Sequence, residues 1–371
     1  MKIFGTKHSA AHYHKKSNKV RRLIVVLLVL CLTVGGGAYL LISSMVQPPS
    51  VPGFVRPLPS VPGERPIAPP QAIAPTNERD IYTIVVAGID EFGLADTMML
   101  IAVHTTTQQM HVVSIPRDTM IDVSWSGPKI NSVIAWTNVY RLMDEIEKIT
   151  GFLPDNYITV GLPAFERLVD TLAGDRGGIE FNVPIRMIYD DPSANPPIHI
   201  DFFPGYQLLN GSQALDVMRF RNNNDGTGFP IPDFGRIQTQ HAFMHTVARE
   251  LLQLRNIAHL GALAEIFVEE VNTNLSLGTI VWYIQQMYQM DSDNIFFHTM
   301  PNEIDVWFQG GSYVLIDLEP WLEMINTYLN PHPLPVTEEH IRLFTRVDGT
   351  ITLVGDHLPL TPPGSRDNFP Q

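Results

Sequence analysis

Cysteine is almost absent from this chain of 371 residues, in which Cys31 is the only one. No disulfide can form within the chain, so a folded domain must be stabilised by burial of its core. Acidic residues are missing from residues 1–46, which hold seven lysines and arginines. The rest of the chain has the other 18 basic residues and all 38 acidic ones, a net charge of −20. This acidic balance argues against nucleic acid as a partner, because nucleic-acid binding depends on lysine and arginine to neutralise phosphates.

Two common catalytic signatures are also missing. The chain has no Gly-x-Ser-x-Gly motif, which removes support for a serine hydrolase. The only run of three glycines, residues 35–37, is not followed by the Lys-Ser or Lys-Thr of a phosphate-binding P-loop. The sequence therefore gives no support to these two nucleotide- or serine-based chemistries.

Charged residues are missing from residues 23–46. As a helix rising about 1.5 Å per residue, this stretch would be about 36 Å long, enough to cross a hydrocarbon core of about 30 Å. All of the nearby basic residues precede it, so we expect a single-pass anchor with residues 1–22 as a cytoplasmic tail and the following domain outside the cell membrane. The basic tail would then contact anionic membrane lipid. The alternative is a cleaved signal peptide, although this apolar run exceeds the usual length and no clear cleavage site follows.

A proline-rich stretch follows at residues 47–78, with ten prolines before residue 77. This density excludes a helix and favours polyproline II, which could extend the chain by about 90 Å. A disordered linker would have the same composition. We therefore expect an extracytoplasmic linker here.

Apolar, β-branched runs alternate with amphipathic segments after the linker. The alternation predicts an α/β fold, with a central mixed β-sheet flanked by helices over residues 79–335. Asp348-Gly349 is a strong hairpin signal, so residues 336–371 are expected to form a hairpin and a disordered tail. Strands are expected at 81–88, 97–104, 110–116, 157–160, 178–184 and 294–299, and helices at 131–150, 163–173, 211–218, 233–255, 277–290 and 318–329.

Two carboxylates flank the first two expected strands. Asp90 follows the first strand, and Asp96 precedes the second. If the strands are neighbours, both side chains meet at one edge of the sheet, where ligands of open α/β sheets bind. Two oxygen donors with free positions suit Mg²⁺. The alternative is a polar loop without a ligand.

Four arginines occupy comparable positions. Arg117 ends the third strand, and Arg236 lies in the first turn of a helix for which Asp233 is the expected N-cap. Arg219 and Arg221 would point to one side of an extended segment, with Phe220 in the core on the other. Guanidinium groups bind two phosphate oxygens at once, and a helix N-terminus favours anions. Surface ion pairs in an acidic domain are the alternative.

Taken in order, the blocks Gly88–Thr97, Ser114–Asp118, Phe202–Arg221 and Asp233–Gln240 resemble the LytR-CpsA-Psr family. These bacterial membrane-anchored ligases move glycopolymers from a polyprenyl pyrophosphate carrier to peptidoglycan. The resemblance implies a phosphotransferase whose partners are the polyprenyl-pyrophosphate-linked glycopolymer, peptidoglycan and membrane lipid. It implies that Mg²⁺ or Mn²⁺ binds Asp90 and Asp96. By the same motifs, the pyrophosphate is held by Arg117, Arg219, Arg221, Arg236 and Gln240, and the catalytic residues are Asp90, Asp96, Arg117 and Arg236.

The chain departs from the family pattern at two places. Leu94 stands where the family has an arginine, and either Lys129 or Arg141 could compensate for the missing guanidinium. Residues 222–232 form a longer loop than usual, which either gates the site or is a tolerated insertion. These departures keep a non-catalytic wall-polymer or lipid-pyrophosphate binding protein open as an alternative. A transcriptional regulator is disfavoured because the basic tail is short and lacks a helix-turn-helix pattern.

Overall fold

The computed structural model describes residues 46–49, 79–194, 197–251, 253 and 260–355. The expected anchor lies outside these residues except for Val46, as do most of the proline-rich stretch and the C-terminal tail. Among the described residues, no helix has both the length and the apolar character needed to span a membrane. The chain divides into two compact units, one of residues 1–48 with 276–283 and one of the remaining residues. The larger unit contains the sheet and the candidate site. In the smaller unit, the structure describes residues 46–48 and the first part of α8 (Leu277–Gln289).

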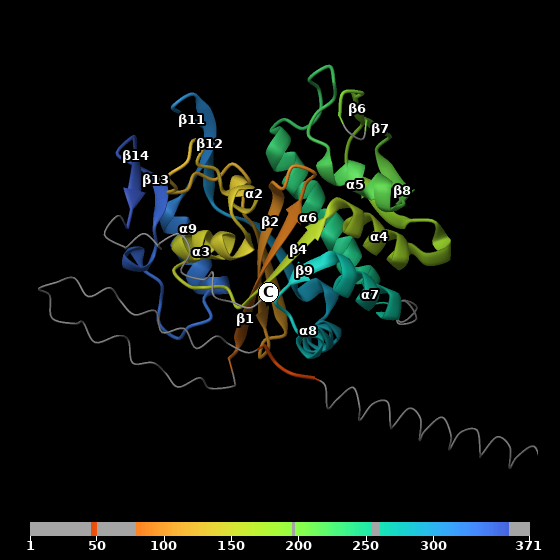
Figure 1. Ribbon diagram of the computed structural model, residues 1–371, viewed down its shortest axis with the longest axis horizontal. Helices are drawn as coiled ribbons and strands as arrows, with labels where there is room; N and C mark the ends of the chain where they lie inside the picture. The colour runs from red at the N-terminus through yellow and green to blue at the C-terminus, as the bar shows by residue number, and fades with distance from the viewer. Residues whose placement is uncertain (1–45, 50–78, 195–196, 252, 254–259, 356–371) are drawn as a thin grey trace, which may run out of the picture. The chain divides into compact units, whose positions relative to one another are not determined.

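A six-stranded sheet forms the centre of the larger unit, in the order β10-β3-β2-β1-β4-β9 (Figure 1). β1 pairs antiparallel with β2 and parallel with β4, so the sheet is mixed. The expected α/β fold with a mixed central sheet is therefore confirmed. The strands are β1 (Ile81–Ile89), β2 (Ala95–His104), β3 (Gln109–Ser114), β4 (Asn156–Gly161), β9 (Val271–Thr273) and β10 (Ile295–Thr299).

One face of the sheet is covered by α3 (Val139–Thr150) and α9 (Leu318–Met324), which continues into the π-helical turn η5 (Ile325–Leu329). The apolar residues of α3 recur at helical spacing, so one side of the helix packs on Val85, Ala87 and their neighbours. Gly151 ends α3 at φ +79, the left-handed conformation typical of a helix C-terminus. Trp321 of α9 is buried, and its indole N–H donates to the carbonyl of Ile149 at 2.7 Å.

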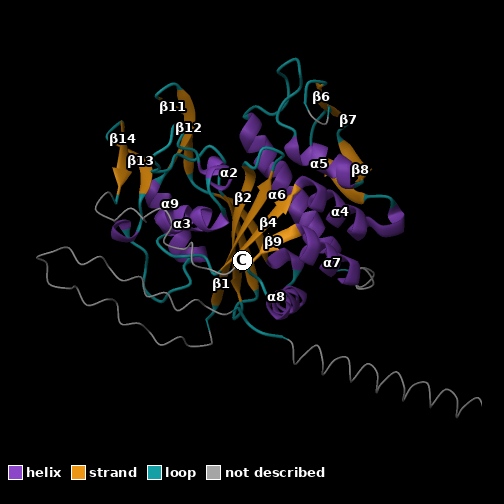
Figure 2. Cartoon of the chain, in the orientation of Figure 1, coloured by secondary structure: helices purple, strands orange, loops and turns teal. Residues whose placement is uncertain are grey.

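The opposite side of the sheet carries a second core, visible in Figure 2 as the helices and short strands around α4, α5 and α6. Gly211, the first residue of α5, has no room for a side chain, because a Cβ there would lie 2.2 Å from the carbonyl oxygen of Glu166 in α4. Asn210 starts α5 with a capping box, as expected for an N-cap. The elements are α4 (Leu162–Ala173), α5 (Gly211–Arg219), α6 (Pro232–Leu251), β5 (Ile179–Val183), β6 (Met187–Asp191), β7 (Ile198–Phe202) and β8 (Gly205–Leu209). α7 (Leu260–Glu270) leads into β9.

The expected hairpin is confirmed as β13 (Leu343–Val347) and β14 (Thr350–Val354), joined by Asp348 and Gly349 at positive φ. Its Phe344 packs against a small cluster of buried residues, some of which belong to β11 (Asn302–Phe308) and β12 (Gly311–Ile316). Strands β6 to β9, β11 and β12 were not expected from the sequence. Short 3-10 helices in the described part of the chain include η2 (Gly174–Arg176), η4 (Ser292–Asn294) and η6 (Glu338–His340).

The single helix expected at 131–150 is wrong. The segment consists of η1 (Ile130–Ser132), α2 (Val133–Trp136) and α3, with a break at Thr137 and Asn138. The Asn138 side chain accepts a hydrogen bond from the Arg141 amide at 3.1 Å and so starts a new helix. The helix expected at 233–255 begins instead at Pro232, which places Asp233 within its first turn.

Candidate functional site

A cavity of about 440 Å³ lies between the sheet and helices α4, α5 and α6. The side chains that line it change from charged and polar at one end to aliphatic at the other. Four residues of one face of α6 line it in succession, from Arg236 and Gln240 to Met244 and Val247. The part away from the arginine is lined mainly by aliphatic side chains, including Val169 of α4. All seven site residues expected from the sequence line this one cavity: Asp90, Asp96, Arg117, Arg219, Arg221, Arg236 and Gln240.

The two expected metal ligands lie at the polar end, where β1 ends and β2 begins. Oδ1 of Asp90 accepts hydrogen bonds from the backbone amides of Phe92 at 2.9 Å and Leu94 at 2.7 Å, which fixes the tight turn between the strands. Oδ1 of Asp96 accepts from Arg117 Nη1 at 2.8 Å. Hydrogen bonds within the described chain thus engage one oxygen of each carboxylate, and the donor set fits a hard divalent cation that also keeps water and phosphate ligands. No group of three or more His, Cys, Asp and Glu suited to a metal occurs among the described residues.

Arg117 is held by the loop after β3. The amide of Thr119 donates to the Pro116 carbonyl at 3.1 Å, and the amide of Asn131 in η1 donates to the Arg117 carbonyl at 3.2 Å. The guanidinium lies between Asp96 and Asp118, whose Oδ2 is 3.8 Å from Arg117 Nε. Burial lowers the pKa of Arg117, but these carboxylates more than offset it, and the net pKa is raised.

Three arginines converge on Asp233. Its Oδ1 lies 2.7 Å from Arg236 Nη2, 3.7 Å from Arg221 Nε and 4.0 Å from Arg117 Nε. The Arg236 side chain is only 5% exposed. Burial, together with the charges of Arg117 and Arg221, lowers the pKa of Arg236 despite the neighbouring carboxylates. Three of the four arginines expected to gather around a phosphate therefore lie together, around a carboxylate of the protein itself.

Arg219 and Gln240 complete the polar end. Arg219 is the last residue of α5, so the expectation of an extended segment on both sides of Phe220 is wrong for it. Phe220 is 2% exposed and anchors the segment in the core, as expected. Arg219 Nη2 lies 3.3 Å from Glu91 Oε1. The Gln240 amide donates to Thr97 Oγ1 at 3.0 Å and to the carbonyl of Met218, which ties α6 to β2 and α5.

Neither residue suggested as a substitute for the missing family arginine lines the cavity, so that suggestion is not supported. Lys129 Nζ pairs with Asp118 at 2.9 Å, and Arg141 pairs with Glu145 on α3 at 2.8 Å. Leu94 contributes its backbone amide to the turn at Asp90.

The longer loop at residues 222–232 contacts the site through Asn222, which lines the cavity. Asn223 is 9% exposed, and its side chain accepts from the amide of Ile188 in β6 at 2.6 Å. Phe229 packs so closely on Gly235 that no Cβ would fit there. The loop is thus fastened at both ends in this conformation.

Two acidic groups near the arginines were missed from the sequence. Asp233 was expected only as a helix cap, although its spacing of three residues from Arg236 on a helix indicates a side-chain pair. Asp216 of α5 lines the cavity, and burial raises its pKa to about 6, with Arg219 opposing the rise and Glu166 adding to it. No local pattern around Asp216 marks it as facing a cavity.

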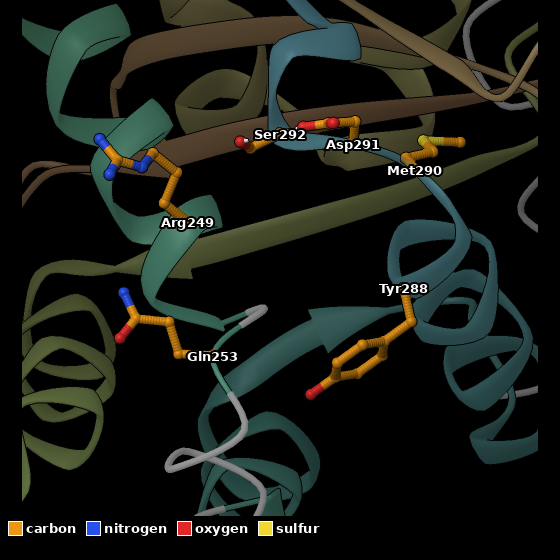
Figure 3. A pocket seen from close by; sticks show the side chains of 6 residues that line it. All are labelled: Arg249, Gln253, Tyr288, Met290, Asp291 and Ser292. Carbon is orange, nitrogen blue, oxygen red and sulfur yellow. Dashed lines mark hydrogen bonds between the residues drawn. The ribbon is translucent and has the colours of Figure 1, made fainter.

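A second hollow lies between the C-terminal end of α6 and the C-terminal end of α8 with the residues that follow it. Figure 3 shows Arg249 and Gln253 on one side of it and Tyr288 and Met290 on the other. Its lining includes one arginine, Arg249, and lacks the aliphatic side chains of the first cavity. Its six lining residues are Arg249, Gln253, Tyr288, Met290, Asp291 and Ser292.

The fold and the first cavity define an αβα domain in which an apolar chamber ends in a cluster of arginines and carboxylates. Residues 63–330 match the model of the LytR_cpsA_psr family, and the chain belongs to this family. The chain is 29% identical over 219 residues to the polyisoprenyl-teichoic acid–peptidoglycan teichoic acid transferase TagU of Bacillus subtilis, a match covering 57% of this chain and 66% of TagU. The regulatory protein MsrR of Staphylococcus aureus is 30% identical over 198 residues, covering 52% of this chain and 56% of MsrR. These matches span about two thirds of TagU and just over half of MsrR.

The fold is similar to that of solved structures of low sequence identity. The crystal structure of Bacillus subtilis TagV aligns with a TM-score of 0.56 at 22% identity, covering 69% of this chain and all of that one. This likeness supports the mixed sheet flanked by helices.

Proposed function

We propose that this domain transfers a glycopolymer from a polyprenyl pyrophosphate carrier to a hydroxyl group of peptidoglycan. The observation that carries the proposal is a single cavity, with an aliphatic chamber at one end and with four arginines and the carboxylates of Asp90 and Asp96 at the other. A polyprenyl pyrophosphate has the same two parts, an apolar tail and an anionic head. The name of the relative TagU, a transferase acting on polyisoprenyl-teichoic acid and peptidoglycan, supports the same substrate class.

In the proposed reaction, the peptidoglycan hydroxyl oxygen attacks the phosphorus atom that carries the sugar. A new P–O bond forms, the bond from that phosphorus to the bridging oxygen breaks, and polyprenyl phosphate leaves with the bridging oxygen. In this scheme the attacking hydroxyl loses its proton to Asp90, which follows β1 and lines the cavity. No covalent intermediate with the protein is required.

The arginines bind and orient the pyrophosphate in this scheme. Arg117, Arg221 and Arg236 lie within 4.0 Å of one carboxylate oxygen, so their charges are concentrated in a space the size of a phosphate group. Phosphoryl transfer depends mainly on such positioning and charge stabilisation. Mg²⁺ or Mn²⁺ held by Asp90 and Asp96 would neutralise part of the pyrophosphate charge. Gln240 holds α6 against β2 and so keeps Arg236 at the polar end.

The aliphatic lining would hold the prenyl tail. Burying hydrocarbon contributes about 0.8 kcal/mol per CH₂ group. A tail bound along Val169, Met244 and Val247 would therefore supply much of the affinity, and the arginines would set its direction.

We further propose that residues 23–46 anchor the chain in the cell membrane, with residues 1–22 in the cytoplasm and the domain outside. The uncharged stretch and its one-sided basic flank support this orientation. Protease added to intact cells should remove the domain; a protected domain would contradict this topology.

The proposed activity is tested with the purified protein and a polyprenyl pyrophosphate analogue, by measuring release of polyprenyl phosphate with and without EDTA. Arg236→Met should abolish release. Arg249→Met is the matched control, since Arg249 is on the same helix but outside the cavity, and it should retain the wild-type rate. Equal loss in both variants would contradict the assignment of the cavity.

A second candidate is a binding protein without turnover, which the leucine at position 94 favours. It predicts that the analogue binds with an affinity that depends on Arg236 but releases no polyprenyl phosphate under any metal condition. A regulatory role, as in the name of MsrR, would require a partner outside this cavity.

A further inference from the structure

Asp233 holds an unusual place for a negative charge, because it lies inside a site proposed to bind an anion. Its Oδ1 is approached by Arg236, Arg221 and Arg117 at 2.7, 3.7 and 4.0 Å. A carboxylate there reduces the positive charge available to a pyrophosphate. Simple charge counting therefore predicts that Asp233 weakens substrate binding.

The burial of individual atoms indicates on which side of the arginines Asp233 lies. The Nε atoms of Arg117, Arg221 and Arg236 and the Oδ1 atom of Asp233 are all buried without a hydrogen-bond partner of good geometry. Yet the Arg117 and Arg221 side chains as a whole are 20% and 40% exposed. The solvent-exposed atoms of the Arg117 and Arg221 side chains are therefore atoms other than Nε. Asp233 Oδ1 therefore lies on the Nε side of Arg117 and Arg221, so the nitrogen atoms of these two that face away from Asp233 account for their exposure. It meets the buried Arg236 through Nη2.

Three guanidinium groups packed this closely repel one another, since none of them loses its charge at physiological pH. Arg117 has a second support in Asp96, at 2.8 Å from its Nη1. Among the ion pairs of the described residues, Arg221 and Arg236 have Asp233 as their carboxylate partner. Without Asp233, Arg221 would be free to turn toward solvent.

We infer that Asp233 is a positioning residue: it holds Arg117, Arg221 and Arg236 side by side, so that the guanidinium nitrogens that it does not contact form a ready-made pyrophosphate cradle. This inference rests on the proposed function, because it names what prepares that site for its ligand. Asp233 contacts no reacting atom in this scheme. Its contribution is the arrangement of the arginines before the substrate arrives, which lowers the cost of ordering them on binding.

The test compares Asp233→Asn with Asp233→Glu. Inorganic pyrophosphate serves as a competitive probe, and its inhibition constant is measured beside kcat for the polyprenyl pyrophosphate analogue. If Asp233 positions the arginines, Asp233→Asn should raise the inhibition constant about tenfold and lower kcat about a hundredfold, as expected for loss of preorganised donors. Asp233→Glu keeps the charge and should recover part of both. Asp175→Asn removes an equal charge at an exposed position and should change neither.

The outcomes separate the possibilities. A lower inhibition constant in Asp233→Asn would mean that charge counting governs binding, and it would overturn the positioning role while leaving the proposed function intact. An unchanged constant and rate would overturn it as well. If the wild-type protein binds no pyrophosphate, the proposed function fails and this inference fails with it. Thermal unfolding of each variant identifies any that do not fold. If Asp233→Asn does not fold, Asp233→Glu becomes the test. A positioning role for Asp233 predicts partial activity in Asp233→Glu, and unaltered pyrophosphate binding in this variant would contradict that role.

Discussion

Replacing Asp96 by asparagine should separate a structural ion pair from a catalytic carboxylate. Asp96 Oδ1 pairs with Arg117 Nη1 at 2.8 Å, but the Asp96 side chain is 34% exposed. Pairs that are open to solvent contribute about 0–1 kcal/mol, so the loss in unfolding free energy should stay within that range. In a domain of this size, that corresponds to a fall in Tm of roughly 2–4 °C at most. If Asp96 holds a divalent metal at the reacting phosphate, kcat should fall by about 10²–10³-fold, on the scale of one lost electrostatic group in a preorganised site.

The assay is release of polyprenyl phosphate at a series of Mg²⁺ concentrations, with EDTA as the blank. Asp118→Asn is the matched control, because Asp118 also approaches Arg117, at 3.8 Å, yet does not line the cavity. Asp96→Asn should lose rate and need more Mg²⁺, whereas Asp118→Asn should keep its Mg²⁺ dependence. An equal loss in both variants would mean that the carboxylates act through Arg117. A wild-type Mg²⁺ titration in Asp96→Asn would refute the metal assignment.

Arg236→Lys keeps the charge but loses the planar pair of donors, and we expect kcat/KM for the analogue to fall about 10–100-fold while the Mg²⁺ dependence is retained. The raised pKa of Asp216, about 6, means that this group contributes stability that is lost as pH rises from about 4 to about 6, so Asp216→Asn should make the stability measured by urea unfolding rise more steeply, or fall less, with pH over this range. Burial lowers the pKa of His241 to about 4, with His298 adding to the effect, so this group contributes a loss of stability as pH drops from about 6.5 to about 4, and His241→Gln should shift the slope over the same range in the opposite direction. Val247→Trp should raise KM for long-chain polyprenyl pyrophosphates in the release assay and leave inhibition by inorganic pyrophosphate unchanged.

The polar end of the cavity could be predicted from the sequence because its residues lie at the ends of regular elements. Asp90 directly follows a strand, Arg117 follows another, and Arg236 is near the start of a helix. Strand and helix ends are visible as changes of hydrophobic period, and such ends gather at one edge of an α/β sheet. Because β1, β2 and β3 are neighbours in the sheet, the residues at these ends lie close together.

The apolar end could not be predicted in the same way. Part of its lining comes from β6 and β7, for example Tyr189 and Ile200, in short strands that have no strong pattern of their own. The break at Thr137 also escaped, because apolar residues keep helical spacing across it and only the Asn138 side chain redirects the backbone. Lys129 and Arg141 were suggested as cavity residues on charge alone, and each has a nearer carboxylate partner. A charged residue in a sequence does not show which of several carboxylates it will meet.

Helix α6 explains why Val247→Trp should affect the tail and spare the head. Arg236, Gln240, Met244 and Val247 line the cavity from one face of this helix, and eleven residues separate the first from the last. At about 1.5 Å per residue, the helix carries the lining from charged to aliphatic over about 17 Å. An indole at position 247 would fill space in the aliphatic chamber while leaving the arginines about three helical turns away unchanged. Substrates with short tails should therefore keep their KM, and a loss of inorganic pyrophosphate binding in this variant would show that the chamber and the arginine cluster do not act as separate sites for tail and head.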